Sequence, residues 1–170
     1  MSLPSWQEAA IDKKHNRKGF NCGQADFNMF LAQYARKAHE NGASKTYIAC
    51  DPDGLTILGF YTLSPAQVEF HRIPEIARSG GRYAVGGFRL GRLAVDKKYQ
   101  GFGLGGQLLI AAAERCIRAS AEMGGTALMI DAKDEQGAAW YKLYGAVSLL
   151  DAPLSLVMPY TLFIKALAKK

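Results

Sequence analysis

The chain has 170 residues, of which 49% are hydrophobic and 21% charged, which is the composition of a globular protein rather than of a disordered chain. This length suits one ordinary domain, and we expect a single domain over residues 1–170. The longest stretches without a charged residue, Tyr99–Ala113 and Ala152–Ile164, are shorter than the roughly 20 apolar residues of a membrane helix. The sequence therefore predicts no membrane span.

The charge and the cysteines narrow the class of protein further. A formal net charge of +6 favours a polyanionic partner such as nucleic acid or a phosphorylated cofactor. Cys22, Cys50 and Cys116 are odd in number and lack metal-site spacing, so we expect reduced thiols rather than a disulfide framework or a metal site. The N-terminal segment has neither the basic start nor the apolar run of a secretory signal, which favours a cytoplasmic protein.

The first predicted element is an amphipathic helix over residues 27–38, which Asn41-Gly42 should end as a C-terminal cap. Its apolar positions are Phe27, Phe30, Leu31, Tyr34 and Ala38. Three segments rich in β-branched and aromatic residues follow, 46–50, 57–64 and 68–73, and predict a meander of antiparallel strands. The loop from Pro74 to Gly87 contains Arg78-Ser79-Gly80-Gly81-Arg82 and is the best candidate for a mobile or binding segment.

The second half of the chain changes to a β-α-β order. A strand over 88–95, a turn over 96–100 and a glycine-rich entry over 101–106 lead into a long helix that ends at Gly124-Gly125. A buried strand over 126–132, a helix over 135–144 and at least one closing strand within 155–164 follow. This order predicts an α+β fold with one βαβ unit.

The glycine-rich segment is suited to phosphate. Backbone N–H groups at a helix N-terminus are unpaired and carry partial positive charge, so a lead-in without side chains lets a pyrophosphate approach them. The alternative is a flexible turn that needs glycine only for its backbone angles. One nucleotide-binding interpretation takes Gly101-Phe102-Gly103-Leu104-Gly105-Gly106 as G-x-G-x-x-G, with Asp131 as the ribose acid of a dinucleotide fold. Residues 96–100 separate the strand from the first glycine, which disfavours that interpretation.

A second interpretation reads Q-x-x-G-x-G from Gln100 to Gly105, after the segment Arg92-Leu93-Ala94-Val95-Asp96. This combination resembles the GNAT superfamily of N-acetyltransferases, whose signature loop binds the pyrophosphate of acetyl-CoA. The resemblance implies that backbone groups of Leu93 and Val95 hold pantetheine and that the loop holds the phosphates. The cofactor-binding residues that it implies are Leu93, Ala94, Val95, Gln100, Gly101, Phe102, Gly103, Leu104, Gly105, Gly106 and Asp131.

The resemblance extends from about His15 to Ile164. Its segments are His15-Asn16-Arg17, Phe20-Asn21-Cys22-Gly23, Gly42-Ala43-Ser44-Lys45-Thr46-Tyr47, Leu90-Gly91-Arg92-Leu93-Ala94-Val95-Asp96, Ile130-Asp131-Ala132 and Trp140-Tyr141-Lys142-Leu143-Tyr144-Gly145. Together they resemble a branch whose characterised members are toxins of toxin–antitoxin pairs that acetylate aminoacyl-tRNA. The chain differs from that branch at Lys45, Trp140, Tyr144 and Ala146. The resemblance implies a GNAT-like α+β fold, with a mixed, largely antiparallel sheet, flanking helices and a central βαβ unit that binds acetyl-CoA.

Acetyl transfer needs a neutral amine, a stabilised oxyanion and a proton for the departing thiolate. Tyr141 matches the general-acid position of the family, and a phenol with an unperturbed pKa of about 10 keeps its proton at neutral pH. The alternative is that Tyr141 is a core residue, as most aromatic residues at helical spacing are. No pattern identifies a general base, because Asp131 and Glu135 fit capping or helix-dipole roles better. The histidines His15, His39 and His71 belong to no catalytic or metal spacing.

Basic side chains are the expected contacts for tRNA. The predicted set is Arg36, Lys37, Lys45, Arg78, Arg89 and Arg92, with Arg82 as a further member. The alternative for each is an ordinary solvated surface position. A spacing of three puts Arg89 and Arg92 on opposite faces of a regular strand, unless a bulge at Gly91 changes the register.

The leading functional hypothesis is a toxin-type acetyltransferase that uses acetyl-CoA to block the amino group of aminoacyl-tRNA and so inhibits translation. The alternatives are a GNAT enzyme that acts on a protein N-terminus or a small amine, and a noncatalytic acyl-CoA-binding regulator. The expected partners are aminoacyl-tRNA and a cognate DNA-binding antitoxin. No metal and no membrane partner are expected, and homodimerisation is left open.

Overall fold

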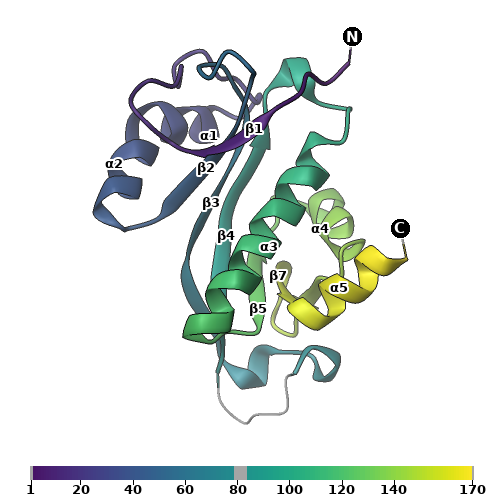
Figure 1. Ribbon diagram of the computed structural model, residues 1–170. Helices are drawn as coiled ribbons and strands as arrows, with labels where there is room; N and C mark the ends of the chain where they lie inside the picture. The colour runs from purple at the N-terminus through teal and green to yellow at the C-terminus, as the bar shows by residue number, and fades with distance from the viewer. Residues whose placement is uncertain (1, 79–83, 170) are drawn as a thin grey trace. The chain divides into compact units, whose positions relative to one another are not determined.

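A computed structural model describes residues 2–78 and 84–169 of the chain (Figure 1). The strands are β1 (Gln7–Ala10), β2 (Lys45–Cys50), β3 (Ile57–Val68), β4 (Val85–Val95), β5 (Ala127–Asp131), β6 (Val147–Leu149) and β7 (Ala152–Pro159). The α-helices are α1 (Ala25–Met29), α2 (Ala35–Asn41), α3 (Leu104–Met123), α4 (Glu135–Lys142) and α5 (Tyr160–Ala168). Shorter turns are the π-helical η1 (Phe30–Tyr34) and the 3₁₀ turns η2 (Phe70–Arg72), η3 (Glu75–Ala77) and η4 (Lys97–Tyr99).

The strands form a seven-stranded sheet in the order β1-β2-β3-β4-β5-β7-β6. β1 and β2, β2 and β3, β5 and β7, and β6 and β7 pair antiparallel, whereas β4 and β5 are parallel. The parallel pair is connected through α3, so β4, α3 and β5 form a βαβ unit. The predicted α+β fold with a mixed, largely antiparallel sheet is therefore confirmed.

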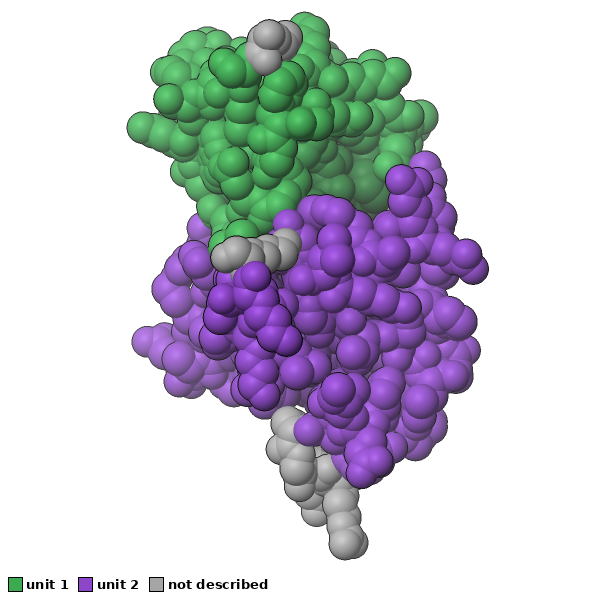
Figure 2. Space-filling model, turned by 90° about the vertical axis from the view of Figure 1, so that its right-hand side faces the viewer, with its two compact units in different colours: residues 1–64, 91–112 green, residues 65–90, 113–170 purple. Residues whose placement is uncertain are grey.

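The chain divides into two compact units, which Figure 2 colours separately. Unit 1 consists of Met1–Ser64 and Gly91–Ala112, and unit 2 consists of Pro65–Leu90 and Ala113–Lys170. β3, β4 and α3 each contribute residues to both units. The glycine-rich loop belongs to unit 1, and Tyr141 belongs to unit 2.

Unit 1 buries apolar side chains on both faces of its strands. One cluster contains Leu31, Ala35, Ile48, Phe60 and Ala94, and a second contains Ala49, Leu58, Leu104 and Leu108. Successive side chains of a strand point to opposite faces, so Ile48 faces the first helical region while Ala49 faces α3. A Cβ at Gly59 would lie only 2.8 Å from the Leu108 side chain, so glycine allows α3 to approach β3.

Unit 2 has its own apolar core around β5. One face contributes to a cluster of Val68, Ile73, Ala77, Val85, Ala127, Met129, Leu149 and Val157. On the opposite face of β5, Leu128 and Ile130 are buried as well. Burial on both faces explains why β5 has a continuous apolar sequence rather than an alternating one.

Two segments differ from the sequence prediction. The strand predicted over 57–64 is confirmed as part of β3, which continues through Pro65 to Val68, whereas the separate strand predicted over 68–73 is wrong because residues 70–72 form η2. A strand tolerates proline where the ladder does not use the missing N–H. The strand predicted over 155–164 is wrong beyond Pro159, where β7 ends and α5 begins. Short apolar runs do not distinguish strand from helix by period alone. β1 and β6 were not predicted, because strands of four and three residues are too short to show a period.

The first helical region contains a π-helical turn that changes which side chains are buried. α1, η1 and α2 follow one another without a break, and Gly42 caps the end with a φ of 83°, as the sequence predicts. A pure α-helical period places Tyr34 on the buried face, but Tyr34 is 56% exposed and Ala35 is fully buried. The wider turn of a π-helix rotates the side chains that follow, so the predicted position of Tyr34 is wrong.

The predicted irregular segment 74–87 contains residues 79–83, which include Arg82 and lie outside the described residues. Its described flanks hold η3 and the start of β4. In residues 2–78 and 84–169, no helix has both the length and the apolar character needed to cross a membrane. Nor does that part of the chain gather three His, Cys, Asp or Glu side chains as metal ligands.

Candidate acetyl-transfer site

The turn between β4 and the glycine-rich loop is held by a buried carboxylate. Asp96 is 6% exposed and accepts hydrogen bonds from the backbone N–H groups of Asn21 and Lys98, both at 3.0 Å. The Lys98 bond is the cap of η4. Because two backbone donors share one buried carboxylate, the chain leaves β4 in a fixed direction.

The side chain of Gln100 ties the loop to its surroundings. Its amide nitrogen donates to the backbone carbonyls of Val95 at 2.8 Å and of Cys22 at 3.1 Å. The sequence predicts Gln100 as a cofactor-binding residue. In the structure, both side-chain N–H groups bind backbone carbonyls of the protein. The backbone of Gln100 is therefore the part that could donate a hydrogen bond to a cofactor.

The loop itself presents backbone groups with open space in front of them. Gly101 and Gly103 have φ values of 87° and 86°, in the left-handed region that favours glycine, and a Cβ at either would meet no atom within 4 Å. The backbone N–H of Gln107 donates to the carbonyl of Gly103 at 3.2 Å. The N–H groups of the three residues before Gln107 therefore have no helical partner and remain donors for an anion.

The strand residues before the loop use their side chains for packing. Leu93 and Val95 pack against the cluster around Leu104 and Leu108, and Ala94 belongs to the opposite cluster of unit 1. Ala94 is buried, whereas Leu93 and Val95 are partly buried. The backbone contact of Leu93 and Val95 with pantetheine, which the family resemblance implies, stays a prediction. Phe102, at the tip of the loop, is 41% exposed.

Tyr141 combines a mostly buried ring with an unpartnered hydroxyl. Its ring packs edge-on against Trp140, with centroids 5.0 Å apart, and Trp140 contacts Tyr144 in the same way at 5.2 Å. Burial raises the pKa of Tyr141 to about 12. Within the described residues, the hydroxyl makes no hydrogen bond. Tyr141 is thus a phenol that holds its proton at neutral pH and has that proton available for a ligand.

The helix that carries Tyr141 begins with a side-chain cap. Asp134 accepts a hydrogen bond from the backbone N–H of Gly137 at 2.8 Å, and Glu135 lies in the first turn. The predicted capping or helix-dipole role fits Glu135, which lies in the first turn, but the N-cap is Asp134, which was not predicted. The signal was present, because an aspartate directly before a helical pattern is a typical N-cap.

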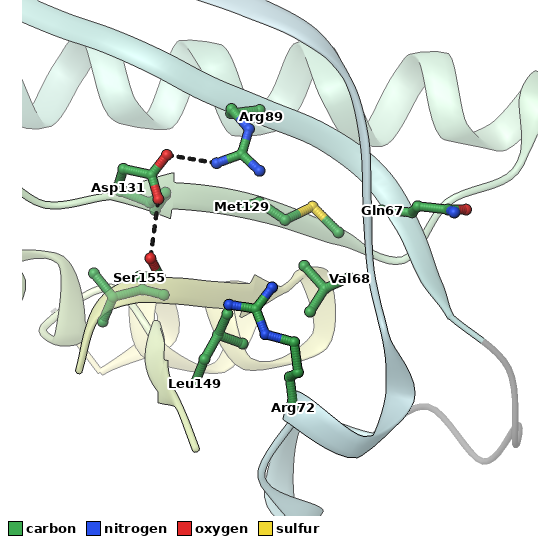
Figure 3. Close-up of a pocket in the computed structure, with 10 residues that line it drawn as sticks. Gln67, Val68, Arg72, Arg89, Met129, Asp131, Leu149 and Ser155 are labelled. Carbon is green, nitrogen blue, oxygen red and sulfur yellow. Dashed lines mark hydrogen bonds and ion pairs between the residues drawn. The ribbon is translucent and has the colours of Figure 1, made fainter. Parts of the chain in front are cut away.

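Asp131 instead belongs to a hydrogen-bonded network on the strands of unit 2 (Figure 3). Its carboxylate pairs with Arg89 at 2.5 Å and accepts a hydrogen bond from the hydroxyl of Ser155 at 3.1 Å. Arg89 comes from β4, Asp131 from the end of β5, and Ser155 from β7. The predicted cofactor residue Asp131 and the predicted tRNA residue Arg89 are therefore direct partners.

The remaining candidate nucleophiles and bases serve the fold. Burial raises the pKa of all three cysteines, that of Cys116 to about 12, so none is a thiolate at neutral pH. The three cysteines are free and buried, as expected. Nδ1 of His15 accepts the backbone N–H of Asp12, and Nδ1 of His39 accepts that of Thr46.

Four of the predicted tRNA contacts lie around the first helical region of unit 1. Arg36 pairs with Glu40 on α2, and the ammonium of Lys45 donates to the backbone carbonyl of His39. Lys37 is exposed. The guanidinium of Arg92 lies over the ring of Phe30 at 3.6 Å, and burial lowers the pKa of Arg92. Because Arg92 has no hydrogen-bond acceptor within the described residues, its N–H groups remain available.

The other two predicted contacts lie in unit 2. Arg78 donates to the backbone carbonyl of Ile73 at 3.0 Å, and its guanidinium lies 4.4 Å from the ring centroid of Phe70. Arg89 pairs with Asp131, as described above. The predicted cationic set therefore divides into two groups, four residues in unit 1 and two in unit 2.

Known proteins resemble this chain over most of its length. The profile of the acetyltransferase (GNAT) family matches residues 14–145. A curated relative from Mycobacterium tuberculosis (strain ATCC 25618 / H37Rv), named tRNA-acetylating toxin, is 34% identical over 122 residues, which are 72% of this chain and 72% of that protein.

Solved structures extend the similarity to the whole fold. The structure of AtaT complexed with acetyl-methionyl-tRNAfMet has a TM-score of 0.86 and 26% identity, over 96% of this chain and 99% of that one. An AtaT toxin variant bound to the C-terminus of the antitoxin AtaR and to acetyl-CoA has a TM-score of 0.80 and 26% identity, over 97% and 99% of the two chains. The family profile covers most of the chain, and the chain belongs to the acetyltransferase (GNAT) family.

Proposed function

We propose that the protein transfers the acetyl group of acetyl-CoA to the amino group of aminoacyl-tRNA and thereby blocks translation, as the toxin of a toxin–antitoxin pair. The observation that carries this proposal is the similarity to a tRNA-acetylating toxin over 72% of both chains, at 34% identity. The AtaT structure with acetyl-methionyl-tRNAfMet supports the same acceptor class. The loop and Tyr141 supply the groups that the reaction requires.

Acetyl-CoA is the proposed co-substrate. The N–H groups at the start of α3, with open space at Gly101 and Gly103, suit a pyrophosphate because they combine free donors with the positive end of the helix dipole. The backbone of Leu93 and Val95 is the proposed contact for pantetheine. Each oxygen of Asp131 already accepts one bond, from Arg89 and from Ser155, so a cofactor contact of Asp131 would use the remaining acceptor positions of this carboxylate.

Tyr141 is the proposed general acid. Acetyl transfer forms a C–N bond and breaks a C–S bond, so the sulfur leaves as a thiolate that needs a proton. The phenol gives that proton, and the proton lost by the attacking nitrogen restores the phenol through solvent. A phenol with a pKa of about 12 is a weak donor to a thiolate in water. Burial that raises the pKa of the phenol also raises that of a neighbouring thiol, which keeps the transfer accessible.

The proposed role of the basic side chains is to bind the acceptor, aminoacyl-tRNA. Arg36, Lys37, Lys45, Arg78, Arg89 and Arg92 are the proposed tRNA contacts. Of these, Arg92 is the strongest candidate, because a flat guanidinium on an aromatic ring with free N–H groups is ready for a phosphate or a base. Arg36 already pairs with Glu40 on the same helix, which reduces its net attraction for an anion.

We further propose that units 1 and 2 belong to one acetyltransferase domain over residues 1–170, since the family profile includes parts of both. A cognate antitoxin is the proposed protein partner, supported by the AtaT complex with AtaR. The cytoplasm is the proposed location, because acetyl-CoA and charged tRNA are available there. A homodimer remains compatible with this proposal.

The test is acetyl transfer from labelled acetyl-CoA to three acceptors: aminoacyl-tRNA, the free amino acid and uncharged tRNA. We expect label only on aminoacyl-tRNA, at the amino group, and arrest of translation in a cell-free system. If label reaches only proteins or small amines, the enzyme is a GNAT of another acceptor class. Binding of acetyl-CoA without turnover would instead identify a noncatalytic regulator.

A further inference from the structure

Unit 2 contains a small pocket that the sequence analysis did not detect (Figure 3). It has a volume of about 70 Å³. Its polar lining consists of Gln67, Arg72, Arg89, Asp131 and Ser155, and buried Val68, Met129 and Leu149 contribute apolar walls. The lining residues come from β3, η2, β4, β5, β6 and β7, so only the folded chain assembles them.

The two arginines of the pocket are held in the same manner. The Nε of Arg72 donates to both carboxylate oxygens of Asp151, at 2.9 and 3.0 Å, and Nη1 of Arg89 donates to Asp131. Each guanidinium therefore uses one edge for an ion pair that fixes its orientation. Figure 3 shows the guanidinium groups of Arg72 and Arg89 on either side of Met129.

The opposite edges of both guanidinium groups remain unused. Within residues 2–78 and 84–169, the terminal nitrogens of Arg72 and the Nε and Nη2 of Arg89 have no hydrogen-bond acceptor. Asp131 also lines this pocket, and each of its two oxygens already accepts one hydrogen bond, from Arg89 or from Ser155. The pocket thus has an excess of donors over acceptors. A ligand that fits it supplies acceptor oxygens.

We propose that this pocket binds one phosphodiester group of the RNA acceptor, with Arg72 and Arg89 donating to its oxygens. The inference rests on the proposed function, because that function makes RNA the acceptor. A volume of about 70 Å³ available to the centres of water-sized spheres exceeds the roughly 10–15 Å³ that one water needs on this measure, so a small anionic group such as a phosphate fits. Two guanidinium groups on one phosphate match the geometry in which arginine binds phosphate oxygens.

Other groups of an aminoacyl-tRNA fit the pocket less well. An apolar amino-acid side chain would cover the free N–H groups of Arg72 and Arg89 without pairing them, which is unfavourable. A protonated amine would face two guanidinium groups of the same charge and one carboxylate, Asp131, that is already paired with Arg89. The phosphodiester is the group that satisfies the donors and also lies close to the acceptor end of the substrate.

The test compares Arg72→Gln with Arg118→Gln. Arg118 is an exposed arginine of α3 that does not line the pocket, so both variants lose one positive charge. We expect the affinity of Arg72→Gln for uncharged tRNA to fall about tenfold, with a salt dependence that is weaker by about 0.7–0.9 in slope, the value for one lost phosphate contact. Arg118→Gln should show a smaller loss. The affinity for acetyl-CoA should stay unchanged in both.

Kinetics and a competitor sharpen the assignment. In Arg72→Gln, the KM for aminoacyl-tRNA should rise about tenfold while kcat is retained, because the contact acts on binding alone. Inorganic phosphate should compete with tRNA in the wild type and much less in the variant. Competition by free phosphate with an unchanged tRNA slope in Arg72→Gln would mean that the pocket takes a free anion, and would overturn the proposal.

Arg72→Lys and the comparison with Arg118→Gln provide two further tests of the pocket. If Arg72→Gln does not fold, Arg72→Lys retains the charge but loses the planar fork, and should show an intermediate loss of tRNA affinity. Equal behaviour of the Arg72 and Arg118 variants would overturn the inference, as would an equal loss of acetyl-CoA affinity. Binding of uncharged tRNA is measured without turnover. If the pocket binds tRNA but no acetylation occurs, the proposed function fails and the pocket assignment stands.

Discussion

The glycine-rich loop and the helix of Tyr141 carry two different kinds of proposed site. In the loop, Gly101 and Gly103 expose backbone N–H groups by having no side chain, and Asp96 and Gln100 fix the backbone from behind. At Tyr141, the proposed acid is a single side chain, and the burial around it raises its pKa. A backbone site depends on which residues are small, whereas a side-chain site depends on what surrounds the residue.

The largest effect should come from a side chain placed in the loop. We expect Gly103→Glu to abolish acetyl-CoA binding, because it adds bulk, a negative charge facing phosphate, and a left-handed φ that only glycine adopts easily. Calorimetry with acetyl-CoA measures this. Gly103→Gln separates bulk from charge and should retain more affinity.

Gly42→Glu is the matched control for the loop. Gly42 has a φ of 83° and open space around its Cβ position, but it caps α2. This variant carries the same added charge and similar backbone strain, and it should bind acetyl-CoA as the wild type does. Unchanged affinity in a folded Gly103→Glu would refute the phosphate role of the loop.

The second effect tests the side-chain site. Tyr141→Phe removes only the hydroxyl, and we expect kcat to fall by roughly 10²–10⁴ while acetyl-CoA affinity and thermal stability change little. Stability should hold because the hydroxyl has no protein partner within the described residues. Tyr144→Phe is the control and should retain most of the turnover. Wild-type turnover of Tyr141→Phe would make Tyr141 a packing residue.

A third effect separates two arginines of unit 1. Arg92→Gln removes a guanidinium stacked on Phe30 with free N–H groups, whereas Arg36→Gln removes one already paired with Glu40. We expect tRNA affinity to fall about tenfold in the first and about twofold in the second, since the positive charge of Arg36 is partly balanced by Glu40 whereas the N–H groups of Arg92 are free for an anion. Filter binding at two salt concentrations measures both. Equal losses would mean that ring stacking gives Arg92 no special role.

A fourth effect compares the two capping aspartates. Asp96→Ala leaves two backbone N–H groups without their buried partner, and should lower the free energy of unfolding by about 2–3 kcal/mol. Asp134→Ala loses an exposed helix cap and should cost about 1 kcal/mol. Urea denaturation measures both. A reversed order would show that the loop is anchored by other contacts.

The smallest effect concerns pH, because we expect no loss of activity near pH 10, where an ordinary phenol titrates. Since burial raises the pKa of Tyr141 to about 12, kcat/KM should rise as the acceptor amine loses its proton and then stay level to above pH 10. The raised pKa also makes the stability of the fold depend on pH. Its contribution is fully present below about pH 10 and is lost as the pH rises to about 12. Loss of activity centred near pH 10 would indicate an unperturbed phenol.

The sequence by itself determined the family, the loop and the order of the main elements. Glycine spacing, the Asn41-Gly42 cap and the apolar run of β5 act locally, so they can be read along the chain. The tertiary structure alone decided the burial of Tyr141, the exposure of Tyr34 through η1, and the helical state of residues 160–168. It also decided the partners of Arg72 and Arg89, which are Asp151 and Asp131. The pocket beside them is lined by residues between Gln67 and Leu156 from six elements. Such environments depend on contacts between distant segments, and no local pattern of residues records them.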